Sequence, residues 1–234
     1  MKYIITILLA CVATIGFSQV EHKARFDNPN GNNILEIVNK NTSFNIIGYD
    51  GNEVIIQKFA IGNEDAKRQK GLMAVYPGGF KDNTGIGFSV KQEGSKISVR
   101  QLSKRPIKLT VKVPRETKIY ISEYSASASN FLDYKVSEIA GEIQIKSNYG
   151  DINFDNINGP IVLETRHGSI EGTFNRLSSQ GPSSLNSSYG IIDVSLNKDA
   201  KVDVILAPRS GQAFTDFDIV HDDSVVEDEK ETGL

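Results

Sequence analysis

Three copies of one short pattern between Gly141 and Leu196 constrain the fold of this 234-residue chain more than any other feature. Each copy begins with a glycine, passes through apolar residues two positions apart to a small hydroxyl residue, and reaches a second glycine three residues later. An isoleucine follows two residues after that glycine. The copies start at Gly141, Gly159 and Gly181 and align without gaps, although the third keeps only one of its paired apolar positions, Leu185. Because side chains alternate between the two faces of a strand, each copy predicts a strand, a glycine corner and a second strand.

So short a unit cannot bury its apolar row alone, whereas stacked copies bury it against one another. An antiparallel sandwich also has short alternating strands, but it does not require the same residue type at the same offset three times. The chain is rich in glycine, with 20 residues, and has no tryptophan, which suits tight corners between short strands. We therefore predict an all-β chain: a β-solenoid of single-stranded, β-helix-like coils, preceded by short antiparallel strands.

The predicted organisation has four parts. Residues 1–18 read as a signal peptide, residues 19–105 as an N-terminal β region, residues 106–220 as solenoid repeats, and residues 221–234 as an acidic, disordered tail. After a polar lead-in from Gln19, strands are expected at residues 34–38, 44–47, 54–59, 87–90, 96–100, 107–113 and 118–122. An excursion at residues 62–85 breaks this rhythm, either as a binding loop or as a tolerated insertion.

Two further stretches resemble coils at the ends of the repeats. Ser122-Glu123-Tyr124 echoes the Ser-Asn-Tyr of the first copy and suggests a degenerate earlier coil. At the other end, Val202, Val204 and Leu206 alternate once more, as a closing coil would.

The N-terminal segment predicts export. Lys2 precedes an apolar run at residues 3–17, which is too short for a spanning helix, and we place cleavage before Gln19. In the alternative, Leu8-Leu9-Ala10-Cys11 is a lipobox and Cys11 is the lipidated first residue. Cys11 is the only cysteine, so cleavage before Gln19 leaves no disulfide and no transmembrane segment. The expected location is the periplasm, the outer-membrane surface or the extracellular space.

The net charge of −3 is too small to indicate nucleic acid or an anionic membrane surface as a partner. Residue types for a catalytic triad occur at His167, Ser169 and Asp151, but no nucleophile elbow or oxyanion motif surrounds the serine. We therefore name no catalytic residue.

Metal and cofactor signals are also weak. No cysteine or histidine cluster predicts zinc. A row formed by Asn153, Glu171 and Asp193 has oxygen ligands for a cation, but the Gly-Gly-x-Gly-x-Asp signature of calcium-loaded β-rolls is missing. No cofactor is expected, and the plentiful carboxylates keep a glycosidase or lyase open as an alternative.

The candidate ligand-facing residues are Tyr149, His167 and Tyr189, which precede the corner glycine in the three copies. Stacking would align them about one strand spacing, ~4.8 Å, apart. By strand alternation they would lie on the same face as the apolar residues before the corner, but on the opposite face from the isoleucine after it. The sequence therefore does not decide whether they point into the core or toward solvent. They form either an aromatic stack that covers a corner or a platform for sugar rings.

The run Leu109-Thr-Val111-Lys-Val113-Pro114, followed by the repeats, resembles the bacterial putative adhesin family of β-solenoid domains. The segment from Leu35 through Asp50 resembles the opening strands of that family. The resemblance implies an exported, adhesin-like protein of otherwise unknown function, of a kind common in Bacteroidetes, and it supplies no catalytic residues. The chain departs from the family pattern in the excursion at residues 62–85 and in the longer third copy.

Three functions follow as hypotheses. The first is a non-enzymatic envelope or cell-surface protein that binds a glycan or a surface partner. The second is a carbohydrate-active enzyme on a β-helix, and the third is a structural envelope component that associates with itself through exposed coil edges.

Overall fold

The computed structural model describes residues 19–59, 76–123 and 131–216. The predicted signal peptide with Cys11, most of the 62–85 excursion, Tyr124 and the acidic tail lie outside the described residues. Within them the chain is all-β, as expected: fifteen strands form two mixed sheets, and the only helical element is a 3₁₀ turn, η2, at Pro77–Gly79. The chain divides into a unit up to Ala200, which holds all fifteen strands, and a second unit from Lys201.

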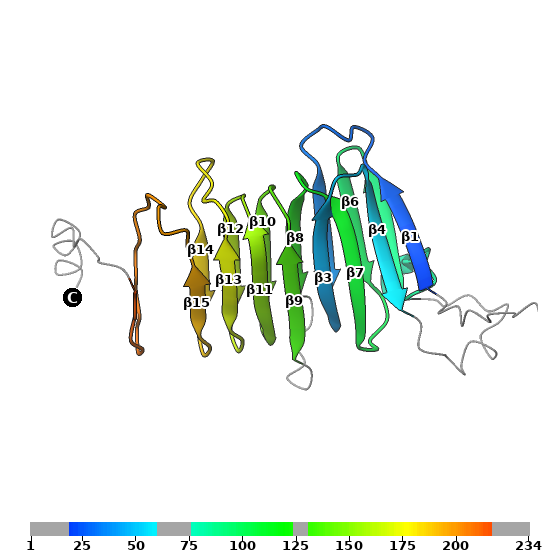
Figure 1. Ribbon diagram of the computed structural model, residues 1–234. Helices are drawn as coiled ribbons and strands as arrows, with labels where there is room; N and C mark the ends of the chain where they lie inside the picture. The colour runs from blue at the N-terminus through cyan, green and yellow to red at the C-terminus, as the bar shows by residue number, and fades with distance from the viewer. Residues whose placement is uncertain (1–18, 60–75, 124–130, 217–234) are drawn as a thin grey trace, which may run out of the picture. The chain divides into compact units, whose positions relative to one another are not determined.

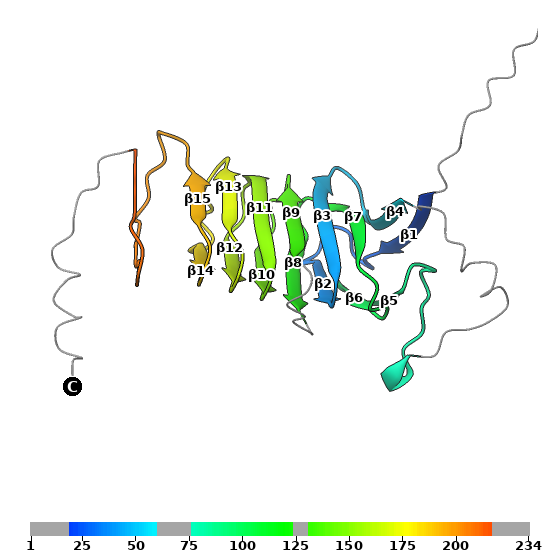
Figure 2. The ribbon, with the colours of Figure 1, turned by 90° about the horizontal axis from the view of Figure 1, so that it is seen from below.

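The two sheets lie face to face in the first unit (Figures 1 and 2). The eight strands of sheet A are, in spatial order, β1 Gln19–Arg25, β4 Glu53–Phe59, β7 Ile107–Pro114, β3 Thr42–Tyr49, β9 Leu132–Ser137, β11 Gly150–Ile157, β13 Ile170–Phe174 and β15 Ile192–Ser195. The seven strands of sheet B are β14 Ser184–Ser187, β12 Ile161–Thr165, β10 Ile143–Ser147, β8 Lys118–Glu123, β2 Ile34–Asn39, β6 Lys96–Gln101 and β5 Phe88–Glu93.

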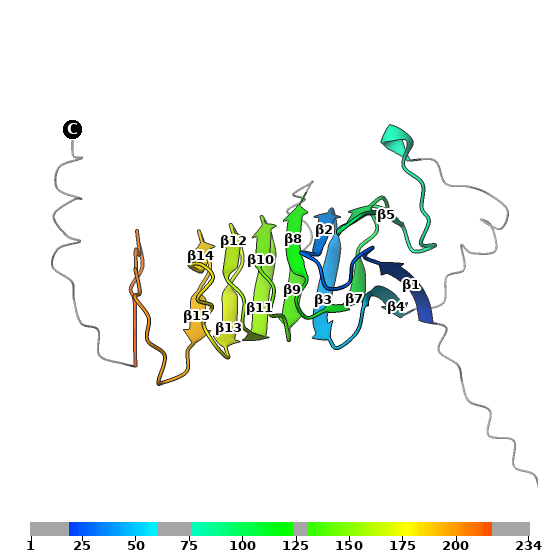
Figure 3. The ribbon, with the colours of Figure 1, turned by 90° about the horizontal axis from the view of Figure 1, so that it is seen from above.

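From β8 onward, successive strands alternate between the two sheets, and from β10 onward each pairs in parallel with the strand two places earlier. The register follows the sequence pattern: Ile143 pairs with Ile161, and Ile152 with Ile170. An earlier coil is present, because β8 pairs in parallel with β10 and Ile121 lies beside Ile145. The predicted match of Ser122 with Ser147 is wrong by one residue, because Ser122 lies beside Lys146. Figure 3 shows the strands of the repeats side by side in chain order.

The strands before residue 105 enter the same two sheets. As predicted, some pair antiparallel: β1 with β4, β4 with β7, and β5 with β6. In contrast, β2 and β3 pair in parallel, with β6 and β8 and with β7 and β9 respectively. Backbone pairing therefore crosses the predicted boundary at residue 105.

Strand β1 corrects one expectation, because Gln19–Arg25 was predicted as a polar lead-in. It pairs with β4 along its whole length at the edge of sheet A. An edge strand with one solvated face accepts polar residues such as Glu21 and Lys23, so composition alone does not exclude a strand there.

The core lies between the sheets as rows of apolar side chains, and the buried residues form one continuous cluster. One position in it is shaped by a missing side chain. A Cβ added to Gly172 would lie 2.5 Å from the Phe154 ring, and that ring contacts Phe174 with centroids 4.9 Å apart. Gly172 thus makes room for a large aromatic side chain from the neighbouring strand.

The corner glycines are required by the close approach of stacked backbones. A Cβ added to Gly159 would lie 2.1 Å from the Gly141 carbonyl oxygen, and one added to Gly168 would lie 2.1 Å from that of Gly150. Real Cβ atoms do not come so close to a backbone oxygen. Gly190 repeats the contact at the next level, 2.0 Å from the Gly168 oxygen.

The small hydroxyl residues of the pattern hold these corners together. Thr165 Oγ1 donates to the Gly150 carbonyl at 3.0 Å, and Ser187 Oγ donates to the Gly168 carbonyl at 2.7 Å. Each hydroxyl therefore satisfies a corner carbonyl of the preceding copy, which explains why the position is Ser or Thr.

The second unit does not form the expected closing coil. Val202, Val204 and Leu206 belong to no strand and are exposed. Alternation alone does not make a strand, because backbone donors and acceptors must also be paired with a neighbour.

Candidate functional site

The structure brings the three candidate residues together as one stack. The rings of Tyr149 and His167 are 4.7 Å apart at an interplanar angle of 10°, and those of His167 and Tyr189 are 4.7 Å apart at 6°. Parallel register produces this alignment, since each residue precedes an equivalent corner glycine.

Phe131 extends the stack, and sequence reasoning missed it. Its ring meets Tyr149 edge to face, with centroids 6.3 Å apart. Leu132 pairs with Gly150, so Phe131 occupies the place of Tyr149 one coil earlier. The sequence of that coil has no corner glycine, and six residues, 125–130, separate Phe131 from the Ser-Glu-Tyr echo. The sequence signal that could have revealed this strand was the alternation of apolar and polar residues through Leu132 and Tyr134. We call Phe131, Tyr149, His167 and Tyr189 the aromatic ladder.

The ladder lies on the outward side of sheet A. Tyr149 is two residues before the exposed Asp151, and burial alternates regularly from Gly150 onward. The rings stack on one another, so Tyr149 and His167 are half-buried and offer mainly their edges and polar atoms. Tyr189, 71% exposed, has an outer ring face available for a flat ligand.

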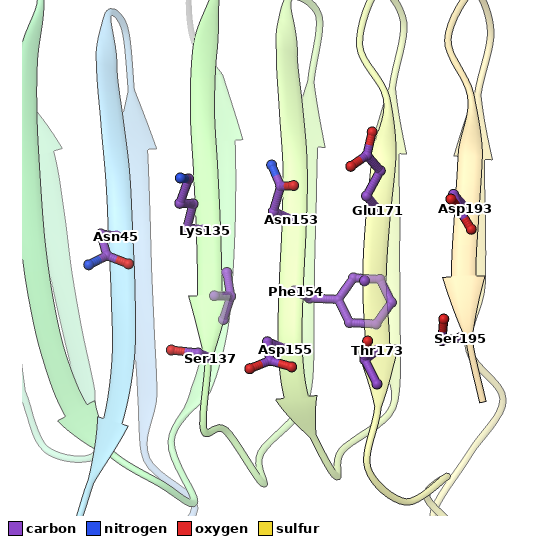
Figure 4. Close-up of a pocket in the computed structure, with 12 residues that line it drawn as sticks. Asn45, Lys135, Ser137, Asn153, Phe154, Asp155, Glu171, Thr173, Asp193 and Ser195 are labelled. Atoms are coloured by element: carbon purple, nitrogen blue, oxygen red, sulfur yellow. The ribbon is translucent and has the colours of Figure 1, made fainter. Parts of the chain in front are cut away.

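Farther along the same strands, the outward face of sheet A forms a shallow open trough of about 560 Å³. Figure 4 shows two rows of side chains that run across the neighbouring strands of this face. The first row is Asn45, Lys135, Asn153, Glu171 and Asp193; the second is Ser137, Asp155, Thr173 and Ser195. We call these nine residues the polar trough.

None of the nine side chains makes a hydrogen bond or ion pair with another described residue. The outward face of sheet B differs, because its charged side chains are paired. Lys96 lies 2.9 Å from Glu36, and Lys146 lies 3.4 Å from Glu164. The hydrogen-bonding capacity of the trough is therefore free for a ligand.

The trough is polar along its whole length and carries both signs of charge. Lys135 lies on β9, whereas the carboxylates of Asp155, Glu171 and Asp193 lie on β11, β13 and β15. Such a set can accept and donate hydrogen bonds, and Val136, Phe154 and Gly172 add apolar lining between the rows. The predicted cation row is present in register, yet no group of three or more His, Cys, Asp or Glu in the described residues could hold a metal ion.

The side chains considered for a catalytic triad, those of Asp151, His167 and Ser169, contact backbone groups or aromatic rings instead of one another. Asp151 Oδ1 accepts a hydrogen bond from the Ser169 amide at 2.8 Å, and Ser169 Oγ accepts one from the Ile191 amide at 3.3 Å. His167 lies between the two tyrosine rings. Asp151 and Ser169 thus fix the start of the next strand in the stack.

A buried polar network at the start of the repeats was also missed. Tyr134 Oη donates to Glu123 Oε1 at 2.8 Å and accepts from Asn39 Nδ2 at 2.8 Å. Ser147 Oγ and the Asn148 amide donate to the same Glu123 carboxylate, at 2.7 and 2.8 Å. Burial raises the pKa of Tyr134 well above its ordinary value, and the Glu123 charge raises it further. The network joins the ends of β2, β8 and β10 to Tyr134 of β9, so its role is structural.

Among the described residues, no helix has the length and apolar character needed to cross a membrane. No family model matches the chain, and no curated protein does. A solved structure with a related arrangement is the "putative cell adhesion protein" from Clostridium sporogenes ATCC 15579. It is 10% identical, covers 77% of this chain and 100% of its own, and has a TM-score of 0.46. A likeness at this level carries no argument about function.

Proposed function

We propose that the chain is an exported, non-enzymatic β-solenoid protein of the cell envelope or surface, and that it binds an extended glycan in the polar trough. The observation that supports this function is the free hydrogen-bonding capacity of nine aligned side chains, on a molecule whose opposite face is internally paired.

An extended glycan suits the shape and the chemistry of the trough. Pockets for small molecules are enclosed and mostly apolar, whereas this surface is shallow, open and polar. Sugar hydroxyls donate and accept hydrogen bonds, so they match a mixture of amide, hydroxyl, ammonium and carboxylate groups. The rows repeat at one strand spacing, about 4.8 Å. A polymer that runs along the stack would therefore meet the same kinds of groups at each strand.

The aromatic ladder borders the trough on the same face of sheet A. In this proposal the ring edges and the hydroxyls of Tyr149 and Tyr189 add polar contacts, and the exposed face of Tyr189 stacks on one sugar ring.

The trough is tested with a glycan array and the chain from Gln19 onward. The double variant Asn153→Ala/Glu171→Ala should weaken binding of any positive glycan at least about tenfold, because each lost hydrogen bond contributes roughly 1 kcal/mol. The matched control is Gln144→Ala/Glu164→Ala on the outward face of sheet B, which should bind like the parent. Equal binding by the trough variant and the parent would exclude the trough.

The ladder is tested separately. Replacing Tyr149, His167 and Tyr189 by alanine should reduce glycan binding, with Tyr189→Ala alone giving the largest single effect. Unchanged binding by the triple variant removes the ladder from the site and leaves the trough as the whole of it.

A second candidate function is a glycan-cleaving enzyme, and one observation favours it. Glu171 and Asp193 lie in register on neighbouring strands, with Asp155 nearby, so the trough holds several carboxylates. Product release from an array-positive glycan, abolished in Glu171→Gln, would replace the binding function by this one.

Export is tested by mass spectrometry of the mature N-terminus. A chain starting at Gln19 agrees with the predicted cleavage, and a lipidated Cys11 establishes a membrane anchor instead.

A further inference from the structure

The two ends of the stack of strands differ in how their edges are protected. At the end formed by β1 and β5, charged pairs occupy the edge strands: Glu21 with Lys23 at 3.1 Å, and Lys91 with Glu93. Charged side chains on an edge strand disfavour pairing with another strand.

At the end formed by β14 and β15, the inner apolar row is open. Ile192 is 41% exposed and Val194 is 37% exposed, although Ile170, the partner of Ile192, is fully buried. Neither β14 nor β15 contains a lysine, an arginine or a proline. The protection of these two strands is limited to their length of four residues and to Asp193, their one charged residue, on the outward face of β15.

The backbone of β15 is paired on one side. The Ile191 carbonyl accepts from the Ile170 amide, and the Ile191 amide donates to Ser169 Oγ, so this residue faces β13. In a strand, alternate residues direct their backbone groups to opposite sides. Ile192 and Val194 therefore direct theirs away from β13, where no described strand pairs with them.

We propose that this end binds the same end of a second copy of the chain, in a two-fold dimer that pairs β15 with β15 and β14 with β14, antiparallel. The partner must offer two strand edges at once, at the separation of sheets A and B, and it must cover the apolar row between them. An identical end meets both conditions, whereas a single extended peptide pairs with one edge only. The charged β1 and β5 edges disfavour head-to-tail assembly.

The oligomeric state of the chain from Gln19 onward tests this dimer. Light scattering after size exclusion, over a range of concentrations, should give twice the chain mass for the parent. Val194→Lys, which blunts the edge, should return the mass to that of a monomer. Ser195→Asn changes the outward face of the same strand without adding a charge and should remain a dimer. A monomeric parent at every concentration overturns the dimer and leaves another molecule, or the chain's own residues after Ala200, as the cover of this end. Open-ended oligomers overturn the two-fold arrangement.

Cysteine cross-linking tests the symmetry directly, because the chain from Gln19 contains no cysteine. Under mild oxidation, Asp193→Cys should give a disulfide-linked dimer, since a two-fold axis through this edge brings the two copies of residue 193 together. Asn153→Cys lies on the same face of an inner strand and should stay monomeric on a non-reducing gel. Equal cross-linking of the two variants, or none for Asp193→Cys, contradicts the proposed dimer.

Discussion

The second and third repeats have the same residue pattern but different surroundings. Gly159 lies against the backbone of the preceding copy, whereas a Cβ added to Gly181 would meet nothing within 4 Å. Ile170 is fully buried, and its counterpart Ile192 is 41% exposed. The pattern therefore sets which residues pair, while the presence of a coil on both sides sets how much each position contributes to stability.

The four extra residues of the third copy explain part of this difference. They fall between Phe174 and Ser183, so the chain reaches β14 through a longer loop, and Gly181 is released from the tight corner that Gly141 and Gly159 form. We therefore expect a substitution in an inner coil to lower the free energy of unfolding more than the equivalent substitution in the last coil.

The glycine pair should show the largest effect. Gly159→Ala places a Cβ against the Gly141 carbonyl and should reduce the free energy of unfolding by about 3 kcal/mol. Gly181→Ala has open space and should change it by less than about 0.5 kcal/mol. Urea unfolding of both variants measures the difference, and equal losses would show that the two corners are alike.

The isoleucine pair sharpens the same comparison. Ile170→Ala leaves a cavity in a closed core and should cost about 3 kcal/mol. Ile192→Ala removes a side chain that is already partly solvated and should cost about 1 kcal/mol in the monomer. Urea unfolding should be recorded on the Val194→Lys background, because a dimer would protect Ile192. A loss at Ile192 as large as that at Ile170 would mean that the last coil is fully covered.

Alkaline unfolding probes the start of the repeats. Burial raises the pKa of Tyr134, so above about pH 10 the unfolded chain loses this proton while the folded chain keeps it. Stability from Tyr134 is therefore fully present below about pH 10 and falls above it, by up to about 1.4 kcal/mol per pH unit. Tyr134→Phe should flatten this slope. Tyr120→Phe, at a half-exposed tyrosine whose pKa burial also raises, should flatten it less. An unchanged slope in Tyr134→Phe would contradict the role given to burial.

The hydroxyl row gives the smallest effects. Thr165→Val keeps the shape of the side chain but leaves the Gly150 carbonyl without its donor, and should cost about 1 kcal/mol. Ser187→Ala, at the part-buried equivalent, should cost about 0.5 kcal/mol because water replaces the lost donor. Thermal unfolding can resolve such differences. A larger loss for Ser187→Ala than for Thr165→Val would contradict the expected difference between inner and last coils.

Much of this fold could be predicted from the repeats, because parallel stacking turns an offset in sequence directly into a neighbour in space. The pairs Ile143 with Ile161 and Tyr149 with His167 follow from the offset alone. The positions that escaped prediction lack this signature. Phe131 and Glu123 belong to a coil whose sequence has no corner glycine, and Gln19–Arg25 becomes a strand only because β4 pairs with it.

The trough could be predicted only in part. Asn153, Glu171 and Asp193 were recognised as one row, but as a possible cation site. Lys135 belongs to the same row because β9 pairs with β11, but β9 lies before the first repeat, so the repeat pattern does not predict this pairing. Whether such side chains are free or paired depends on cross-strand neighbours, and that information is absent from any one strand.

Pairing between residues only 17 to 22 positions apart also has a mechanical consequence. A force applied from the C-terminal side would first break the backbone hydrogen bonds between β15 and β13, and then those between β13 and β11. Each coil would therefore separate from the preceding one in turn. Each released repeat would lengthen the chain by roughly 65 Å, given about 3.5 Å per extended residue. Near β1 and β4 the partners lie farther apart in sequence and in two antiparallel pairs, so the same pull must break a whole sheet at once. Held at a surface by its first residues, such a molecule would yield in steps and keep its anchored end folded.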